Sequence, residues 1–343
     1  MDNQLVFHAS ENLSTEDITH HLSEGPGALI IRGAYSDNKL LDAVESVFYS
    51  RIAEEGEQTK DHFSEGTNKR LWNALNKLAE DAPELFAEYY GNQYLHLGCQ
   101  AWLGPLYQIT AQVNVVMPNG PPQIGHRDYH LGYFPPDIIR QMPKAIYSVS
   151  PWLTLQGAVV HCDVPIEMGP TKLLLGSQKD KLGYLTYRDD EEQNRFAREA
   201  IQVEFKKGDL VLFNPAIFHA AGGNSTDSPR LVNLLQVSSA LAKPMEHLDF
   251  CELVKQVYPM LINLNDEGLV ERTIKTLVDA YPFPSNLDLD PPSEDWLGEL
   301  DSSWLLDEWK ARRDPKSVMT DFQERLAKRR YRNSKKSQKL HGS

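Results

Sequence analysis

The chain has 343 residues, a formal net charge of −13 and a hydrophobic content of 41%. This is enough for a sizeable core in one large domain or two ordinary ones, while the negative charge argues against non-specific binding to nucleic acid or anionic lipid. No apolar run approaches the roughly 18 residues of a membrane span, and the N-terminus lacks the pattern of a signal peptide. We therefore expect a cytoplasmic protein without membrane or nucleic-acid partners.

Three cysteines, Cys99, Cys162 and Cys251, are spread along the chain and form no C-x-x-C pair. An odd number at these spacings supports neither a disulfide framework nor a cysteine-based zinc site. A reducing interior is the setting that this pattern favours.

The first hundred residues are predicted to form a helical scaffold. Ser14 to Asp17 has the capping-box pattern of a helix start, and that helix should end at the Gly-Pro-Gly of 25–27. Residues 28–31 are typical of a buried strand. Helical spacing of apolar residues follows at 40–54, and again at 74–90 with an interruption at Pro83.

The pattern changes near residue 106. Segments 106–117, 153–164, 201–213 and 231–239 are rich in β-branched and aromatic residues and predict strands. Helical periodicity returns after Pro244, and the last predicted helix spans about 304–330 before a basic tail. We therefore expect an α+β fold. A domain of 1–243, with a helical scaffold (1–105) and a barrel core (106–243), would be followed by a helical C-terminal extension (244–343).

One set of residues indicates a catalytic site: His126 and Asp128, then His219, then Arg230. Residues i and i+2 of a strand face the same side, so His126 and Asp128 can point into one pocket. Two imidazoles and one carboxylate can hold Fe(II) and leave its opposite face open for O2. The turn-rich segment 222–229 predicts an antiparallel hairpin that would bring Arg230 alongside. A guanidinium there could grip the distal carboxylate of 2-oxoglutarate, a cosubstrate with a carboxylate at each end.

A lone H-x-D triplet also fits an ordinary polar loop, so the ordered set of motifs matters more than any one. That set resembles the phytanoyl-CoA dioxygenase family of iron(II) and 2-oxoglutarate-dependent oxygenases. The residues that carry the resemblance are QIGHRD at 123–128, EMGPT at 167–171, LGS at 175–177, KGDLVLF at 207–213, His219 and Arg230.

The resemblance implies a double-stranded β-helix, a jelly-roll barrel with iron at its open end. Carried over residue by residue, His126, Asp128 and His219 would be the metal ligands and catalytic centre. Arg230, Gln123 and Thr171 would bind 2-oxoglutarate. Arg70 matches a further contact with this cosubstrate, although an exposed helix arginine is the competing interpretation.

Substrate contacts are predicted just beyond the H-x-D motif. His130 and Tyr133 begin a long aromatic segment, 129–152, that could be a lid over the pocket or a packed surface loop. We assign both residues to substrate. His161, within an apolar strand, is interpreted as a core histidine.

The expected function is that of an Fe(II) and 2-oxoglutarate-dependent dioxygenase that hydroxylates a small organic metabolite and releases succinate and CO2. Asp128 argues against halogenases, in which a small residue replaces the carboxylate. Gln236 stands where nucleic-acid demethylases of the superfamily usually carry a second arginine, which argues against that branch. Two alternatives stay open: a protein hydroxylase acting on a partner recruited by the C-terminal region, and a redox-silent module that binds metal or 2-oxoglutarate. The substrate and the existence of a homo-oligomer are not decided by the sequence.

Overall fold

The structure is a computed structural model that describes residues 4–63, 66–292 and 299–330. Most of the predicted basic tail lies outside these ranges. Within them, no helix is both long and apolar enough to cross a membrane. Cys99, Cys162 and Cys251 are all free, as their spacing predicted.

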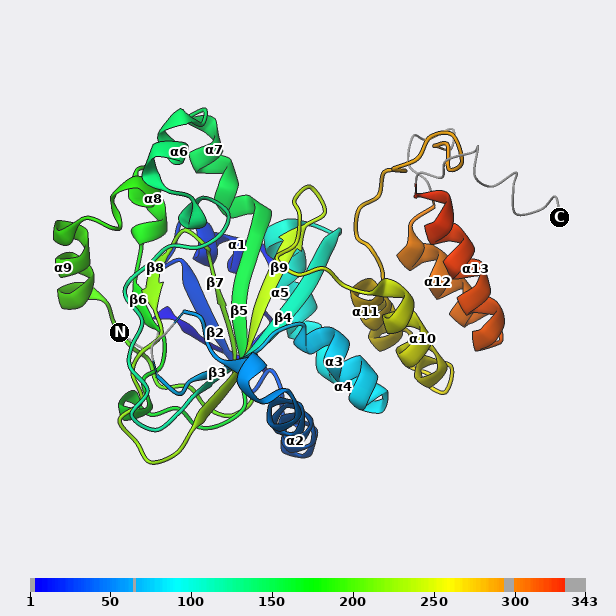
Figure 1. The fold of residues 1–343 in the computed structure, drawn as a ribbon, viewed down its shortest axis with the longest axis horizontal. Coiled ribbons are helices and arrows are strands. Elements are labelled where there is room, and N and C mark those ends of the chain that lie inside the picture. The colour runs from blue at the N-terminus through cyan, green and yellow to red at the C-terminus, as the bar shows by residue number, and fades with distance from the viewer. Residues whose placement is uncertain (1–3, 64–65, 293–298, 331–343) are drawn as a thin grey trace.

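The centre of the fold is a seven-stranded sheet with the strand order β1-β2-β7-β5-β9-β4-β3 (Figure 1). Only β1 and β2 pair in parallel, and the other neighbours are antiparallel. A second sheet consists of β6 and β8. The strands are β1 (Val6–His8), β2 (Ala28–Arg32), β3 (Lys69–Leu71), β4 (Tyr107–Val116), β5 (Thr154–Val160), β6 (Lys172–Leu174), β7 (Leu210–Phe213), β8 (Phe218–Ala220) and β9 (Arg230–Ser239).

Three of the four strands predicted in the barrel core are confirmed as β4, β5 and β9. The prediction for 201–213 was too long, because only its last four residues form β7. A turn at Lys206 to Asp209 breaks the segment. The Asp209 carboxylate accepts a hydrogen bond from the Lys206 backbone (2.8 Å), and Gly208 takes a φ of 88° that favours glycine.

Helices cover the main sheet and extend the molecule to one side (Figure 1). The capping box predicted for the first helix is confirmed, since Ser14 Oγ accepts a hydrogen bond from the Asp17 backbone and Asp17 accepts one in return. The helices are α1 (Thr15–Ser23), α2 (Asn38–Glu55), α3 (Ala74–Asp81), α4 (Pro83–Tyr90), α5 (Gln93–Leu103), α6 (Pro136–Gln141), α7 (Ala145–Val149), α8 (Gly183–Thr186), α9 (Asp190–Glu199), α10 (Phe250–Leu261), α11 (Glu267–Leu277), α12 (Asp301–Lys310) and α13 (Pro315–Lys328).

The single helix predicted at 304–330 was wrong. Two helices, α12 and α13, are separated by a short turn in which Arg312 has a φ of 52°. Asp314 then caps α13 by accepting a hydrogen bond from the Ser317 backbone, and Pro315 occupies the first turn, where its missing N–H costs nothing.

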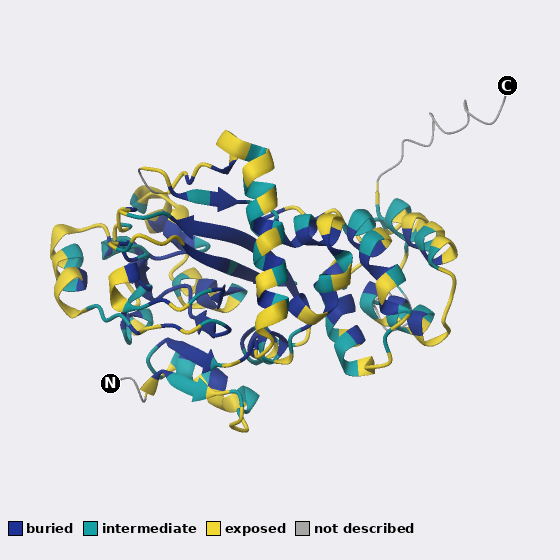
Figure 2. Cartoon of the chain, turned by 90° about the horizontal axis from the view of Figure 1, so that it is seen from below, coloured by how far each residue is buried: buried dark blue, intermediate teal, exposed yellow. Residues whose placement is uncertain are grey.

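The hydrophobic core lies on both faces of the main sheet. Alternate residues of β9 point in opposite directions, so Leu231 and Leu235 face the helices while Val232 faces the second sheet. The cluster on the helical side continues without a break from α1–α5 into α10–α13. Figure 2 shows the central strands buried along their length, whereas the edge strand β1 is only partly buried, and the exposed residues lie on the outer faces of the helices and in the loops.

The mixed α+β class is therefore confirmed, with a main sheet that is antiparallel apart from one edge pair. The described strands form two separate sheets and not a closed barrel. Isolated bridges at His126–His219 and Leu173–Ile201 widen the smaller sheet. Its buried residues, such as Leu173, pack with Val211 and Val232 of the larger sheet.

Candidate metal centre

The segment that carries the H-x-D motif runs antiparallel to β8. The His126 backbone N–H donates to the His219 carbonyl (2.8 Å) and the His219 N–H donates back to that of His126 (3.0 Å). Because this backbone is extended, His126 and Asp128 share one side, while Arg127 points away and donates to the carbonyls of Ser177 and Ala216. The motif is thereby held against the strand that supplies the second histidine.

The predicted hairpin between His219 and Arg230 was wrong. β8 pairs with β6 in the smaller sheet, whereas β9 pairs with β4 and β5 in the larger one. The segment between them crosses from one sheet to the other. His219 and Arg230 consequently line one cavity from opposite sheets.

The side chains of His126, Asp128 and His219 converge so that one ligand atom from each lies within 4.8 Å of the others. The two carboxylate oxygens of Asp128 lie 3.8 Å from His126 Nε2 and 3.6 Å from His219 Nε2. Each imidazole donates from Nδ1 to the carbonyl two residues earlier, Ile124 at 2.8 Å and Ile217 at 3.0 Å. These bonds leave both Nε2 lone pairs directed at the shared site, which is the tautomer that metal ligation requires.

The electrostatics keep Asp128 ionised. Burial alone would raise its pKa, but His126, His219 and a hydrogen bond from Gln156 Nε2 (2.6 Å) outweigh that effect and the pKa lies below the ordinary value. Burial lowers the pKa of His126, which favours the neutral, ligating form. The donor set thus consists of two imidazoles and one carboxylate.

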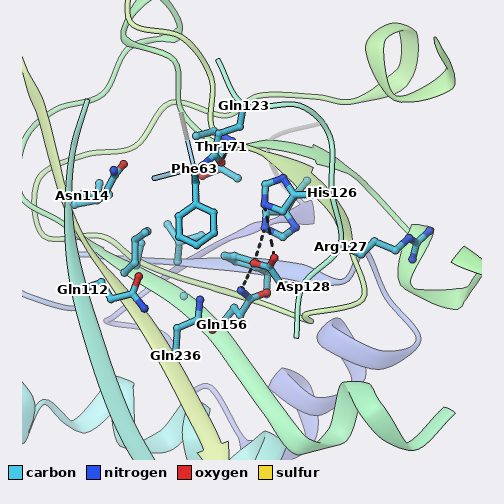
Figure 3. Close-up of a pocket in the computed structure, with 18 of the residues that line it drawn as sticks. Phe63, Gln112, Asn114, Gln123, His126, Arg127, Asp128, Gln156, Thr171 and Gln236 are labelled. Atoms are coloured by element: carbon cyan, nitrogen blue, oxygen red, sulfur yellow. Dashed lines mark hydrogen bonds and ion pairs between the residues drawn. The ribbon is translucent and has the colours of Figure 1, made fainter. Parts of the chain in front are cut away.

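The three residues line a cavity of about 420 Å³ between the sheets, and Figure 3 shows His126 and Asp128 on one side of it. Among the residues assigned to 2-oxoglutarate from the sequence, Gln123, Thr171, Arg230 and Arg70 all line it. Gln123 is held just beyond the end of β8 by two hydrogen bonds with Ala221: its backbone N–H donates to the Ala221 carbonyl (3.0 Å), and its side-chain oxygen accepts from the Ala221 N–H (3.2 Å).

Thr171 follows a tight turn in the second motif. Gly169 has a φ of 69°, and a Cβ there would collide with the carbonyl of Gly223. Glycine at this position therefore lets two loops cross closely enough to bring Thr171 to the cavity wall.

Arg230 is a buried cation that faces no carboxylate among the described residues. Its Nη1 donates to the Met168 carbonyl (3.0 Å), and its Nε has no hydrogen-bond partner in the part of the chain that the structure describes. Burial lowers the pKa of the guanidinium to about 10. A buried, incompletely paired guanidinium is expected where an anionic ligand binds.

Arg70 differs from the competing interpretation of an exposed helix arginine, which was wrong. It lies on β3, is 5% exposed, and pairs with Asp61 (Nε to carboxylate, 3.0 Å) and Gln112 (3.0 Å). Its charge is therefore balanced within the protein, unlike that of Arg230.

Of the two residues predicted to contact substrate, Tyr133 lines the cavity and His130 does not. Although 46% of Tyr133 is exposed, burial of its hydroxyl beside the Asp128 carboxylate raises the tyrosine pKa. The His130 ring packs on that of Tyr129 (centroids 4.2 Å apart) and the His130 backbone donates to Ser150 Oγ (3.3 Å). The geometry gives no support for its assignment to substrate.

His161 is a core histidine, as expected: it is 1% exposed, and its Nε2 lies 2.7 Å from the Tyr89 hydroxyl. The segment 129–152 folds into short helices that leave several large apolar side chains exposed. These are Tyr133, Phe134, Ile138, Ile146, Val149 and Trp152.

A polar wall of the cavity was not predicted from the sequence. Its members are side-chain amides on three neighbouring strands: Gln112 and Asn114 on β4, Gln156 on β5, and Gln236 on β9. In the sequence, Gln236 is notable only because related nucleic-acid demethylases usually carry an arginine at this position. The signal was present in β4, where Gln108, Thr110, Gln112 and Asn114 alternate with apolar residues at the period of a strand.

The donor set suits Fe(II), and the unpaired Arg230 in the same cavity suits the free carboxylate of a 2-oxo diacid. The residues present therefore fit both groups that the sequence implied.

Two solved structures match the chain, and the first of them indicates a similar fold. The crystal structure of the non-heme alpha ketoglutarate dependent carbocyclase SnoK from nogalamycin biosynthesis matches with 17% identity and a TM-score of 0.50, covering 69% of this chain and 94% of that one. The epimerase SnoN from the same biosynthesis matches with 16% identity and a TM-score of 0.43, covering 66% and 83%.

No curated protein matches the chain in sequence. The family model described as phytanoyl-CoA dioxygenase, however, matches residues 23–232, more than half of the chain. The chain therefore belongs to the phytanoyl-CoA dioxygenase family of non-haem iron and 2-oxoglutarate-dependent enzymes.

Proposed function

We propose that the protein is a dioxygenase that hydroxylates a small organic metabolite, consuming O2 and 2-oxoglutarate and releasing succinate and CO2. The observation that carries the proposal is one cavity that holds both the His126, Asp128 and His219 cluster and the unpaired guanidinium of Arg230. Iron bound at the cluster would supply the activation of O2 that drives oxidation of an unactivated C–H bond.

The protein's own residues would provide placement and a protected environment. The Nδ1 bonds hold both imidazoles in the ligating tautomer, and Gln156 holds the carboxylate of Asp128. Arg230 would orient 2-oxoglutarate by its distal carboxylate, with Gln123 and Thr171 alongside. Because Asp128 fills the carboxylate position, the site offers no room for the halide that a halogenase requires.

We also propose that the two sheets are the walls of a double-stranded β-helix. The bridges at His126–His219 and Leu173–Ile201 support this by widening the smaller sheet toward four strands. In this scheme 1–243 is the catalytic domain and 244–343 is a helical extension of it.

The test is turnover of 2-oxoglutarate by the protein loaded with Fe(II) in air, measured as succinate released in the absence of substrate. The parent should release succinate slowly, because such oxygenases turn over 2-oxoglutarate at a low rate without their substrate. Alanine at His126, Asp128 or His219 should reduce this rate to background. His8→Ala is the matched control, since His8 is an exposed histidine away from the cavity. Full activity in Asp128→Ala would contradict the assignment, and 2-oxoglutarate binding without succinate release would indicate a redox-silent module instead.

A further inference from the structure

Two glutamines that face each other across neighbouring strands distinguish the cavity wall. Gln156 of β5 and Gln236 of β9 are directly opposite in the strand register, and both line the cavity (Figure 3). They are 2% and 8% exposed. In each, the side-chain oxygen is buried and accepts no hydrogen bond from the described residues.

The orientation of the Gln156 amide is fixed by its neighbour. Its Nε2 donates to the Asp128 carboxylate at 2.6 Å, and an ionised carboxylate can only accept hydrogen bonds. The amide therefore cannot be reversed without placing two oxygens in contact. Its Oε1 is a buried acceptor that has no donor among the described residues.

The other amides of the wall are already engaged. Gln112 accepts from Arg70 (3.0 Å) and contacts Met245 Sδ through its Nε2 (2.9 Å), while Asn114 donates to Asp61 (3.3 Å). The unmet hydrogen-bonding capacity of the amide wall thus concentrates on Gln156 and Gln236.

The cosubstrate cannot meet that need. 2-Oxoglutarate as a dianion carries only acceptors, and its proposed partner, Arg230, is a donor without an acceptor at Nε. The two parts of the cavity that lack hydrogen-bond partners therefore favour different ligand groups. Arg230 favours an anion, whereas Gln156 and Gln236 favour hydrogen-bond donors.

We propose that Gln156 and Gln236 form a substrate-binding amide pair that selects a molecule bearing a hydroxyl or amide N–H close to the carbon that is oxidised. This inference rests on the proposed function, which it deepens by naming the substrate class. Apart from Asp128, which is engaged by the histidines and Gln156, no carboxylate lines the cavity among the described residues. The donor is therefore neutral, and cations are not the preferred ligands.

In this proposal the side-chain amide of Gln156 contacts both the proposed iron ligand Asp128 and the substrate. A donor bound at its Oε1 would lie one amide group away from Asp128. Gln236 has no such contact, so it reports substrate recognition alone.

The experiment compares matched pairs of probes that differ only in a donor: cyclohexanol with its methyl ether, and pyrrolidinone with N-methylpyrrolidinone. Dissociation constants are measured by ligand-observed NMR on the full chain loaded with Zn(II) and 2-oxoglutarate, a state without turnover. The parent should bind the uncapped member of each pair about twofold to tenfold more tightly, the range expected for one neutral hydrogen bond. Gln236→Leu should remove most of that preference without changing the zinc content, and Gln236→Met provides a second apolar side chain if leucine packs poorly.

Gln108→Leu is the matched control. Gln108 is an equally buried strand glutamine that does not line the cavity, and its replacement should leave the preference intact. Equal binding of capped and uncapped probes by the parent, or binding of neither, overturns the inference. So does a full preference in Gln236→Leu, which would assign the unpaired oxygens to ordered water. If the parent shows the preference but releases no succinate with Fe(II), the proposed function fails while the amide pair stands.

Discussion

Replacing Arg230 with leucine should weaken the binding of 2-oxoglutarate while leaving metal binding intact. The side chain is 4% exposed, and among the described residues its guanidinium donates a hydrogen bond only to the Met168 carbonyl. A carboxylate bound there would receive charge-assisted hydrogen bonds in a site shielded from water. The same change should spare the His126, Asp128 and His219 cluster, which lies on other segments.

The magnitude follows from the bonds that would be lost. Hydrogen bonds to charged groups contribute about 1.5–3 kcal/mol each, and about 1.4 kcal/mol corresponds to a factor of ten. Arg230→Leu should therefore weaken binding by roughly tenfold to a few hundredfold. Arg230→Lys keeps the charge but loses the two-pronged geometry, so its effect should fall near the lower limit.

Stability provides an independent readout. Burial holds the pKa of Arg230 near 10, which means that the folded protein bears a cost for this unpaired charge. Without 2-oxoglutarate, Arg230→Leu should therefore melt at the same temperature as the parent or higher. The rise in melting temperature that 2-oxoglutarate gives the parent should be largely absent in the variant.

Binding can be followed without oxygen, by titrating 2-oxoglutarate into the Fe(II)-loaded protein and recording the metal-to-ligand absorption band. Arg195→Leu is the control, because it removes the same charge from the surface of α9. If Arg230→Leu binds 2-oxoglutarate as tightly as the parent, the guanidinium does not bind this cosubstrate and the 2-oxo diacid assignment loses its main support.

Two further predictions concern buried charges near the cavity. Burial raises the pKa of Glu246 from 4.5 to about 7, so between these pH values the folded protein holds a proton that the unfolded chain has released, and stability falls as pH rises. Glu246→Gln should therefore stabilise the protein by up to about 3 kcal/mol at pH 8 and have little effect near pH 4.5, as measured by thermal melts; equal effects at both pH values would contradict this. Arg70→Met should cost about 3–5 kcal/mol in urea unfolding, because it removes the cation 3.0 Å from the buried Asp61 carboxylate. Adding Asp61→Asn should recover most of that loss, and a double variant as unstable as the single one would show that the ion pair is not the cause.

The parts of the fold that the sequence predicted are those with local causes. The capping box at Ser14, Pro83 at the start of α4 and the apolar run of β9 each act through neighbouring residues, and each element was found where it was expected. The spacing of His126 and Asp128 is local in the same sense, since an extended backbone puts them on one side. Errors arose where a local signal was overlooked, as with Pro315, which begins a new helix instead of lying within one.

The hairpin from His219 to Arg230 failed for a different reason. The loop at 222–229 has the composition of a turn whether its flanking strands pair with each other or enter different sheets, so composition cannot distinguish the two. The choice depends on β4 and β5, which pair with β9 and leave β8 to β6. The predicted position of Arg230 beside the metal site is therefore correct, although the hairpin from which it was predicted does not form.

The polar wall shows why substrate recognition was harder to predict than the metal centre. The proposed metal ligands are recognisable from their residue types and order, whereas Gln156 and Gln236 lie 80 positions apart and become partners only through strand register. A single glutamine within an apolar strand does not by itself indicate a binding site. Its role depends on whether its side chain lies in a packed core or at a cavity. Leu235 and Gln236 are adjacent in sequence, but Leu235 faces the helical core and Gln236 faces the cavity. The face of the main sheet that looks toward the smaller sheet therefore combines two demands: apolar residues such as Val211 and Val232 hold the sheets together, and the amides among them are retained where a ligand can complete their hydrogen bonds.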